Sequence, residues 1–504
     1  MTVVQAGSIN TAALVVPDLV VQVIPPSVQL INGAPTNAIG VVGIAAWGPV
    51  GVVVPLSDYQ GYVRAFGQLQ ARSYDMGTQV AAAILQGANQ FRCVRATDGT
   101  DAAASASVQT NCLTLTAAYT GSLGNSISVA IAPGTAASSY KATVTLPNVG
   151  TVPEVFDNIT GTGNALWVAI ASAINNGLSS LRGPSQLVTA TAGAGTTTPT
   201  TTTYALSGGT DGASTISAST IVGSDSTPRK GMYALRGTGA QILLLADMTD
   251  STQWSTISSF ALFEGMYAVL AGAAGQTISA AVSAKTTAGL DSYAVKVLLG
   301  DYVLWVDNVT GQQRYVSPAP FIAGRLGNLA PNQSSLNKPL YGVAGTQRTA
   351  TGAPYSSAEL TTLAQAGIDV IALPSVGGAY YSARIGRNSS SNAVIRGDNY
   401  TRMTNFLATT INQGMGYAIG RPNTADTRRG VKVTLDSFFA SLRQQGLIDG
   451  WQILCDDSNN LPARVALGYM QADCRVAYQS ITDYLLANLE GGQSVQITRQ
   501  PLAG

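Results

Sequence analysis

Histidine is missing from this chain of 504 residues. It is the side chain best suited to proton transfer near neutral pH, and it is the commonest metal ligand in proteins. Its absence excludes histidine-based catalytic triads and histidine-containing zinc sites. No pattern of carboxylates or nucleophiles in the sequence suggests another catalytic site. We therefore expect no enzyme, no cofactor and no bound metal.

Charge is also scarce, because only 11% of the residues are charged, about half of the usual share. The 27 basic and 26 acidic residues leave a net charge of +1. Long-range attraction to nucleic acid or to an anionic membrane therefore has no support along the sequence. A surface with few charges and many small side chains is instead suited to close packing between protein subunits.

Cysteine is too rare to cross-link a chain of this length, and no pair has the CxxC spacing of metal or redox sites. The four cysteines are Cys93, Cys112, Cys455 and Cys474. We expect free and mostly buried thiols, as in a protein that assembles in a reducing cytoplasm. The first basic residue is Arg64, so a secretory signal peptide is not expected. The most membrane-like segment, Gly265–Ala284, is uncharged for 20 residues but is too polar to predict a membrane span.

The length predicts two to four domains, and the pattern predicts a multidomain α/β protein with an inserted β-rich domain and extended ends. Three prolines, Pro17, Pro25 and Pro26, favour an extended N-terminal segment. Residues 101–215 have few charges and alternate like strands, except for the helical LWVAIASAINNGL. In chain order, the predicted divisions are 1–34, 35–100, 101–215, 216–345, 346–492 and 493–504.

Local signals predict individual elements within these divisions. Ser57 or Asp58 is expected to cap one helix, Asp75 begins a second, and QILLLADM is expected to be a buried strand. The threonine tract 196–203 is expected to be an exposed loop. Near the C-terminus we expect helices in YTRMTNFLATTINQGM and LDSFFASLRQQG, and then a last helix and strand within residues 470–498.

Several polar motifs have a structural and a functional interpretation. Asp250 is interpreted as a helix cap, and Asp456–Asn460 as a polar turn, because that motif lacks the spacing of a calcium loop. A basic group in RPNTADTRRGVKV is expected to be a solvated loop, or alternatively to meet an acidic partner. It consists of Arg421, Arg428, Arg429 and Lys432.

Five blocks, in order, resemble the contractile tail sheath family. They are TNAIGVVGIAAWGPVGVVVPLSDYQGYVRAFG, AAAILQGANQFRCVRA, FIAGRLGNLAPNQSSLNKPLYGV, YTRMTNFLATTI, and FFASLRQQGLIDGWQILCDD with NNLPARVALGYMQ. The blocks span most of residues 35–490, apart from the insert at 101–215. The chain departs from the family pattern at Leu326 and Asn328, where Ala and Asp are usual, and VAYQSITDYL lacks the proline of the last helix.

The resemblance implies a subunit of the virion tail that is assembled in the cytoplasm of a host bacterium. Such subunits form hexameric rings that stack helically around an inner tube and contract by rotation. Residues 35–100 and 346–492 would form the sheath core, 101–215 an outer domain, and 216–345 a middle α/β domain. The implied partners are other copies of the chain, the tube protein, and the baseplate and tail terminator proteins.

Segments 1–34 and 493–504 would be arms that link neighbouring subunits by adding strands to their sheets. The candidate linking strands are Leu19, Val20, Val21, Gln22, Val23 and Ile24, and Val495, Gln496, Ile497 and Thr498. Within the tube-facing domain, the basic group with Arg421, Arg428, Arg429 and Lys432 is the candidate tube contact. The alternative function is that of another self-assembling phage or surface protein, such as a tube component or an adhesin.

Overall fold

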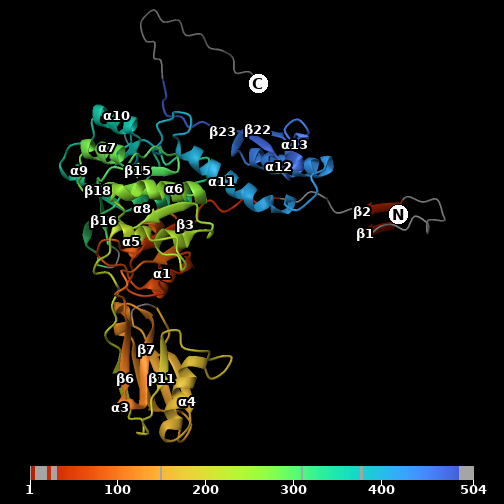
Figure 1. Cartoon of the computed structure of the whole chain (residues 1–504). Coiled ribbons are helices and arrows are strands. Elements are labelled where there is room, and N and C mark those ends of the chain that lie inside the picture. The colour runs from red at the N-terminus through yellow and green to blue at the C-terminus, as the bar shows by residue number, and fades with distance from the viewer. Residues whose placement is uncertain are drawn as a thin grey trace, which may run out of the picture.

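The computed structural model describes residues 31–147, 150–307, 310–374 and 378–486, and the backbone of two short strands at 2–5 and 20–23. Figure 1 shows three parts: a central α/β domain, a β-rich domain at one end of it, and a helical subdomain to one side. Within the described residues, no helix has the length and hydropathy that crossing a bilayer requires.

A seven-stranded sheet forms the centre of the α/β domain, in the order β19-β15-β14-β13-β3-β5-β4. Its strands are parallel except for β4 at one edge. The central strands are buried along their length, as expected for a parallel sheet that is covered on both faces. The bounds are β3 Ile39–Gly43, β4 Val53–Leu56, β5 Phe91–Arg95, β13 Ile242–Leu245, β14 Tyr267–Ala271, β15 Val295–Leu298 and β19 Ile368–Asp369.

Helices cover both faces of this sheet. One face packs against α1 (Tyr59–Phe66), α2 (Met76–Leu85) and α8 (Ala319–Asn328). The opposite face packs against α5 (Ala218–Val222), α6 (Trp254–Glu264), α7 (Ile278–Thr287) and α10 (Ser357–Ala366). Of the two predicted alternatives for the cap of α1, Asp58 is the cap, and Asp75, the predicted start of α2, caps that helix; both carboxylates accept from backbone N–H groups.

The seven-stranded sheet joins segments that the sequence pattern separated. Its strands come from 35–100, 216–345 and 346–492, because pairing in a parallel sheet does not follow proximity along the chain. The predicted boundary between residues 345 and 346 falls inside β18 (Val343–Thr346), which pairs with β16 (Val303–Val306). A separate middle α/β domain is therefore not seen in the structure.

The β-rich domain is inserted between β5 and β13, and the chain enters and leaves it at the bridged pair Ala102 and Thr210. A four-stranded sheet and a three-stranded sheet enclose a core that α4 (Gly163–Asn176) completes. The strands are β6 Ala103–Val108, β7 Leu113–Thr120, β8 Ser128–Pro133, β9 Tyr140–Thr145, β10 Glu154–Ile159, β11 Val188–Ala192 and β12 Thr202–Ala205. The predicted loop 196–203 is therefore wrong at its end, where Thr202 begins β12.

The helical subdomain contains α11 (Asp398–Gly414), α12 (Ala425–Gln444) and the antiparallel strands β22 (Ile448–Leu454) and β23 (Asp473–Tyr478). The prediction for α12 began too late, since the helix starts at Ala425, ten residues before LDSFF, with Thr424 as its cap. The solvated loop predicted for the basic group is thus wrong from Ala425 onward. A helix was expected after residue 470, but the described chain there forms β23 and then an extended segment.

The remaining α-helices and strands of the described residues are short. They are α3 Gln109–Cys112, α9 Gln347–Ala350, α13 Pro462–Ala466, β17 Gln313–Val316, β20 Ile371–Ala372 and β21 Ser382–Ala383, with β1 Thr2–Gln5 and β2 Val20–Val23 near the N-terminus. The four cysteines are free, and three of them are buried.

Candidate assembly site

The predicted N-terminal linking strand lies partly in β2. Val20–Val23 form this strand, and they pair in parallel with β1 (Thr2–Gln5), a pairing that was not expected. Figure 1 shows the two strands apart from the rest of the molecule. The flanking Leu19 and Ile24 lie outside the described residues, and so does the C-terminal candidate strand Val495–Thr498.

Strands β22 and β23 form a sheet of only two strands on the helical subdomain. One face covers the core between α11 and α12, where Trp451, Ile453 and Val476 pack. Within the described residues, neither outer edge of this pair has a partner strand. Two-stranded sheets are marginally stable, and open edges are ready to pair with another strand.

The edges of the seven-stranded sheet differ from those of β22–β23. Edge strand β4 contains Pro55, which has no N–H group to donate to an added strand. The opposite edge, β19, is only two residues long. Prolines and very short strands are common means of preventing pairing at a sheet edge. The β22–β23 sheet therefore offers the better place for strand addition.

A buried charge cluster joins the helical subdomain to the α/β sheet. Lys296, in the middle of β15, places its Nζ 2.6 Å from an oxygen of Asp369 and 3.1 Å from an oxygen of Asp398, the first residue of α11. All three side chains are fully buried. Asp398 also accepts from the hydroxyl groups of Tyr267, at 2.5 Å, and Ser335.

Burial and charge pairing shift the pKa values of this cluster in opposite directions. Burial alone would raise the pKa of Asp398, but the charge of Lys296 and the donated hydrogen bonds lower it below its usual value. Burial would also lower the pKa of Lys296, whereas the two carboxylates raise it. One turn along α11, buried Arg402 donates to the carbonyls of Leu329 and Ala330, both at 2.9 Å. Charged bonds thus hold the start of α11 against the sheet.

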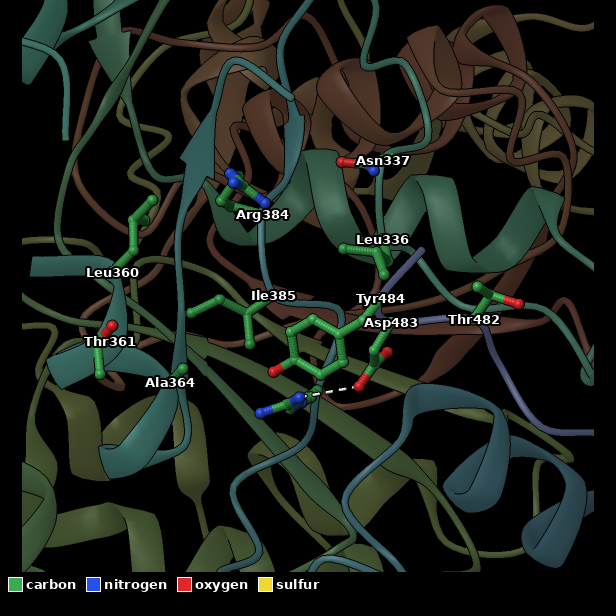
Figure 2. Close-up of a pocket in the computed structure, with 11 residues that line it drawn as sticks. Leu336, Asn337, Leu360, Thr361, Ala364, Arg384, Ile385, Thr482, Asp483 and Tyr484 are labelled. Atoms are coloured by element: carbon green, nitrogen blue, oxygen red, sulfur yellow. Dashed lines mark hydrogen bonds and ion pairs between the residues drawn. The ribbon is translucent and has the colours of Figure 1, made fainter. Parts of the chain in front are cut away.

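The extended segment that follows β23 returns to the α/β domain. Gln479 accepts from the side-chain amides of Asn399 and Asn332. Arg387 forms an ion pair with Asp483 at 2.8 Å, and although burial opposes it, this hydrogen bond raises the pKa of the guanidinium. Figure 2 shows Asp483 and Tyr484 beside Ile385 and Leu336, at the wall of a cavity of about 210 Å³.

The residues of the basic group have different environments. Arg428 is buried and donates to Asp457 and to Asn423, so it holds loops together and is not free to contact a tube. Arg429 is 76% exposed and lies 3.4 Å from Asp426 on the same helix. Arg421 is exposed and lies over the ring of Tyr417, and Lys432 is partly exposed. Asp456–Asn460 form the predicted turn beside this group.

No family model and no curated protein matches the sequence. Among solved structures, the sheath tail protein of Desulfitobacterium hafniense matches with a TM-score of 0.60 at 15% identity, over 87% of this chain and 93% of that chain. The sheath tail protein of Listeria innocua matches with a TM-score of 0.62 at 13% identity, over 90% and 96%. The PVC sheath of an extracellular contractile injection system, in its contracted state, gives 0.54 at 12% identity, over 95% and 98%.

The chain has the fold of contractile tail sheath proteins. The resemblance predicted from the five sequence blocks is thereby confirmed at the level of the fold. The matches cover 93%, 96% and 98% of the known chains. They do not favour the alternative of a tube component or an adhesin.

Sequence analysis missed the buried charge cluster, although one signal was present. Lys296 interrupts the apolar run YAVKVLLG, and Asp369 interrupts IDVIAL. A charge inside a strand that is covered on both faces needs an opposite charge nearby. That rule predicts a buried pair, but the sequence does not tell which acidic residue approaches Lys296.

Proposed function

We propose that this protein is the structural subunit of a contractile tail sheath, without enzymatic activity. The observation that carries the proposal is the sheath fold, shared over at least 87% of this chain with each of the three sheath proteins described above. In this role, copies of the chain form hexameric rings that stack helically around an inner tube in the virion tail, after assembly in the bacterial cytoplasm. Contraction would rotate the subunits outward and drive the tube through the host envelope.

Strand addition is the proposed means of linking the subunits. The open edges of β22–β23 support it, because they would receive main-chain hydrogen bonds from an extended segment of a neighbour. The proposed donors are Leu19–Ile24, which includes β2, and Val495–Thr498. For β2 to act as a donor, it must leave β1 or carry β1 with it into the acceptor sheet.

The proposed partners besides other copies are the inner tube, the baseplate and the tail terminator. Arg421, Arg429 and Lys432 remain the proposed tube contacts, since their side chains are at least partly exposed near the start of α12. Arg428 is no longer part of this proposal, because its guanidinium is engaged within the subdomain. An acidic surface on the tube would complement the three remaining cations.

Electron microscopy of the purified chain tests the sheath function. We expect hollow polymers with sixfold rings at high protein concentration. Chains that lack residues 1–33 or 493–504 should form no stable polymers. As a control, the truncated chains should elute as folded monomers. A full-length chain that stays monomeric at high concentration would contradict the sheath function, and polymers unaffected by both truncations would contradict strand linking alone.

A further inference from the structure

The buried charge cluster holds an amine and a carboxyl group in contact inside the core. Nζ of Lys296 lies 2.6 Å from Oδ2 of Asp369. Its other contacts are the two oxygens of Asp398, at 3.1 and 3.3 Å, and the carbonyl of Arg387. A single carboxylate would be enough to pair this cation, but two are in contact with it. The cluster therefore contains a nucleophile, an acyl group and a separate base.

The register of the sheet places the amine and the carboxyl group on one face. Leu298 on β15 pairs with Asp369 on β19, and Lys296 precedes Leu298 by two residues. Because side chains two residues apart on a strand point to the same face, Lys296 and Asp369 share one side of the sheet. The lysine therefore reaches the carboxyl group directly from the neighbouring strand.

Backbone N–H groups surround the carboxyl group of Asp369. Its Oδ1 accepts from the N–H groups of Val370, at 2.8 Å, and Ile385, at 2.9 Å. Its Oδ2 accepts from the N–H group of Gly386 at 2.9 Å and is the oxygen that contacts Lys296. Two donors held on one oxygen stabilise the oxyanion that forms when a nucleophile adds to a carbonyl carbon. Oδ1 is therefore the oxygen that carries the negative charge, and Oδ2 is the oxygen that can leave.

Asp398 lies where it can carry protons between the amine and Asp369. Both of its oxygens contact Nζ of Lys296, and hydrogen bonds from Tyr267 and Ser335 fix the carboxylate. Burial alone favours the neutral amine, but the two carboxylates raise the pKa of Lys296. The ammonium must therefore pass a proton to a group in contact with it before it can act as a nucleophile, and Asp398 is the base that is not itself attacked.

We propose that Lys296 and Asp369 condense to an isopeptide bond within the folded chain, with Asp398 as the proton carrier. Nζ of Lys296 gives a proton to Asp398 and bonds to Cγ of Asp369, and the bond between Cγ and Oδ2 then breaks. Of the three protons of the ammonium, one stays on the amide nitrogen and two leave with Oδ2 as water. Asp398 ends as a carboxylate again, so the step needs no oxidant, cofactor or second reactant. Each chain modifies itself once, and no substrate is turned over.

Burial and proximity both favour this condensation. An ammonium and a carboxylate lose hydration when they are buried, and the amide that replaces them is neutral. Reactants that the fold holds in contact also have a high effective concentration. Asp398 keeps its hydrogen bonds from Tyr267 and Ser335 after the step. It is also the first residue of α11, where the helix dipole favours a negative charge.

The bond would tie a short edge strand to its sheet. Strand β19 has only two residues, and the chain that follows it leads to the helical subdomain. A covalent link between β15 and β19 would hold this strand in place when a force pulls the subdomain away from the α/β domain. The bond and the sheath function do not depend on each other, so a failure of one leaves the other standing.

Mass spectrometry of the purified full chain tests the bond without any substitution. We expect the reduced protein to be lighter than its sequence by about 18 Da, the mass of one water. After unfolding and digestion, trypsin should not cleave at Lys296, and the peptide Thr286–Arg314 should stay joined to Thr349–Arg384. Cleavage at Lys285, whose Nζ donates to two carbonyl groups, is the internal control. Full cleavage after Lys296, with the mass of the sequence, would overturn the proposal and leave an ion pair only.

Three substitutions test the role of each residue, counting only chains that elute as folded monomers. Lys296→Arg keeps a cation but should have the mass of its sequence, because arginine stays protonated. Asp369→Asn should still condense, but with loss of ammonia, about 17 Da, instead of water. Asp398→Asn should slow the appearance of linked chains after cell-free synthesis at least tenfold, because the proton carrier is lost.

Two results would overturn these assignments even if the chain loses water. A link from Lys296 to the peptide Gly397–Arg402, which contains Asp398, would show that Asp369 is not the acyl group. Linked chains of Asp398→Asn that appear at the rate of the unmodified protein would show that Asp398 carries no proton in the step.

Discussion

Lys296 on β15 and Asp398 at the start of α11 form an ion pair with no exposure to solvent, 102 residues apart in the chain. A buried charge that loses its partner is strongly destabilising. We expect Lys296→Met and Asp398→Asn each to lower the free energy of unfolding by about 3–5 kcal/mol. Chemical denaturation of the monomeric chain measures this.

A double substitution measures the interaction between Lys296 and Asp398 apart from their other contacts. Combining Lys296→Met with Asp398→Asn should cost less than the sum of the single changes, because Asp398 is then no longer a buried charge without a partner, and only Asp369 loses its cation. Asp426→Asn is the control, since Asp426 is 92% exposed and its pair with Arg429 should contribute little. Strictly additive single changes would mean that the two residues act independently.

Asp75 gives the stability of the α/β domain a pH dependence of known sign. Burial raises the pKa of Asp75 to about 6, although hydrogen bonds from Thr78 and Gln70 partly offset it. In the unfolded chain this carboxyl has a pKa near 3.8. Because the pKa of Asp75 is higher in the folded chain than in the unfolded chain, its contribution to stability is fully present below pH 3.8. That contribution is lost as the pH rises toward 6.

Replacing Asp75 with Asn isolates this effect, because Asn still caps α2. The advantage of the unmodified chain over Asp75→Asn should fall by about 2–3 kcal/mol between pH 4 and pH 7, at 1.36 kcal/mol per pKa unit. Asp58→Asn is the matched control at the cap of α1, where the exposed carboxyl has a lowered pKa. Its effect should stay constant over that range, and an equally flat result for Asp75→Asn would refute the raised pKa.

Arg428 and Arg429 are neighbours on α12 with different expected roles. Arg428→Ala should lower the free energy of unfolding by about 1–3 kcal/mol, since partly buried acceptors on Asn423 lose their donor. Arg429→Ala should change stability by less than about 0.5 kcal/mol, because its ion pair is exposed. Because Arg429→Ala should be as stable as the unmodified chain, co-sedimentation of the two with polymers of the tube protein compares their affinity for the tube. An unchanged affinity of Arg429→Ala would argue against Arg429 as a tube contact.

Local sequence signals predicted most helices and strands, but they did not predict which distant residues pair in the fold. The starts of α1 and α2 were found at Ser57 or Asp58 and at Asp75, because a helix start depends on residues within its first turn. The partners of Lys296 were not found, since Asp369 and Asp398 lie 73 and 102 residues away, and only the fold brings them together. The same holds for the assembly site, where the sequence showed extended ends but not the open edges of β22–β23.

Two helical glycines with opposite surroundings provide the last prediction. A Cβ atom on Gly324 of α8 would lie 2.5 Å from the carbonyl oxygen and 2.6 Å from the Cα of Ala83 on α2, both backbone atoms. The two helices would have to separate, so Gly324→Ala should lower the free energy of unfolding by about 1–3 kcal/mol. Gly430, inside α12, has no atom within 4 Å of such a Cβ.

Gly430→Ala should therefore stabilise the chain by about 0.5–1 kcal/mol, through the lower backbone entropy of alanine in the unfolded state. The same substitution thus has opposite signs at the two sites, and denaturation of both variants under one set of conditions measures the difference. A stabilising Gly324→Ala would show that α2 and α8 can move apart without cost. In that case the close packing of these helices would not be what holds α8 against the sheet.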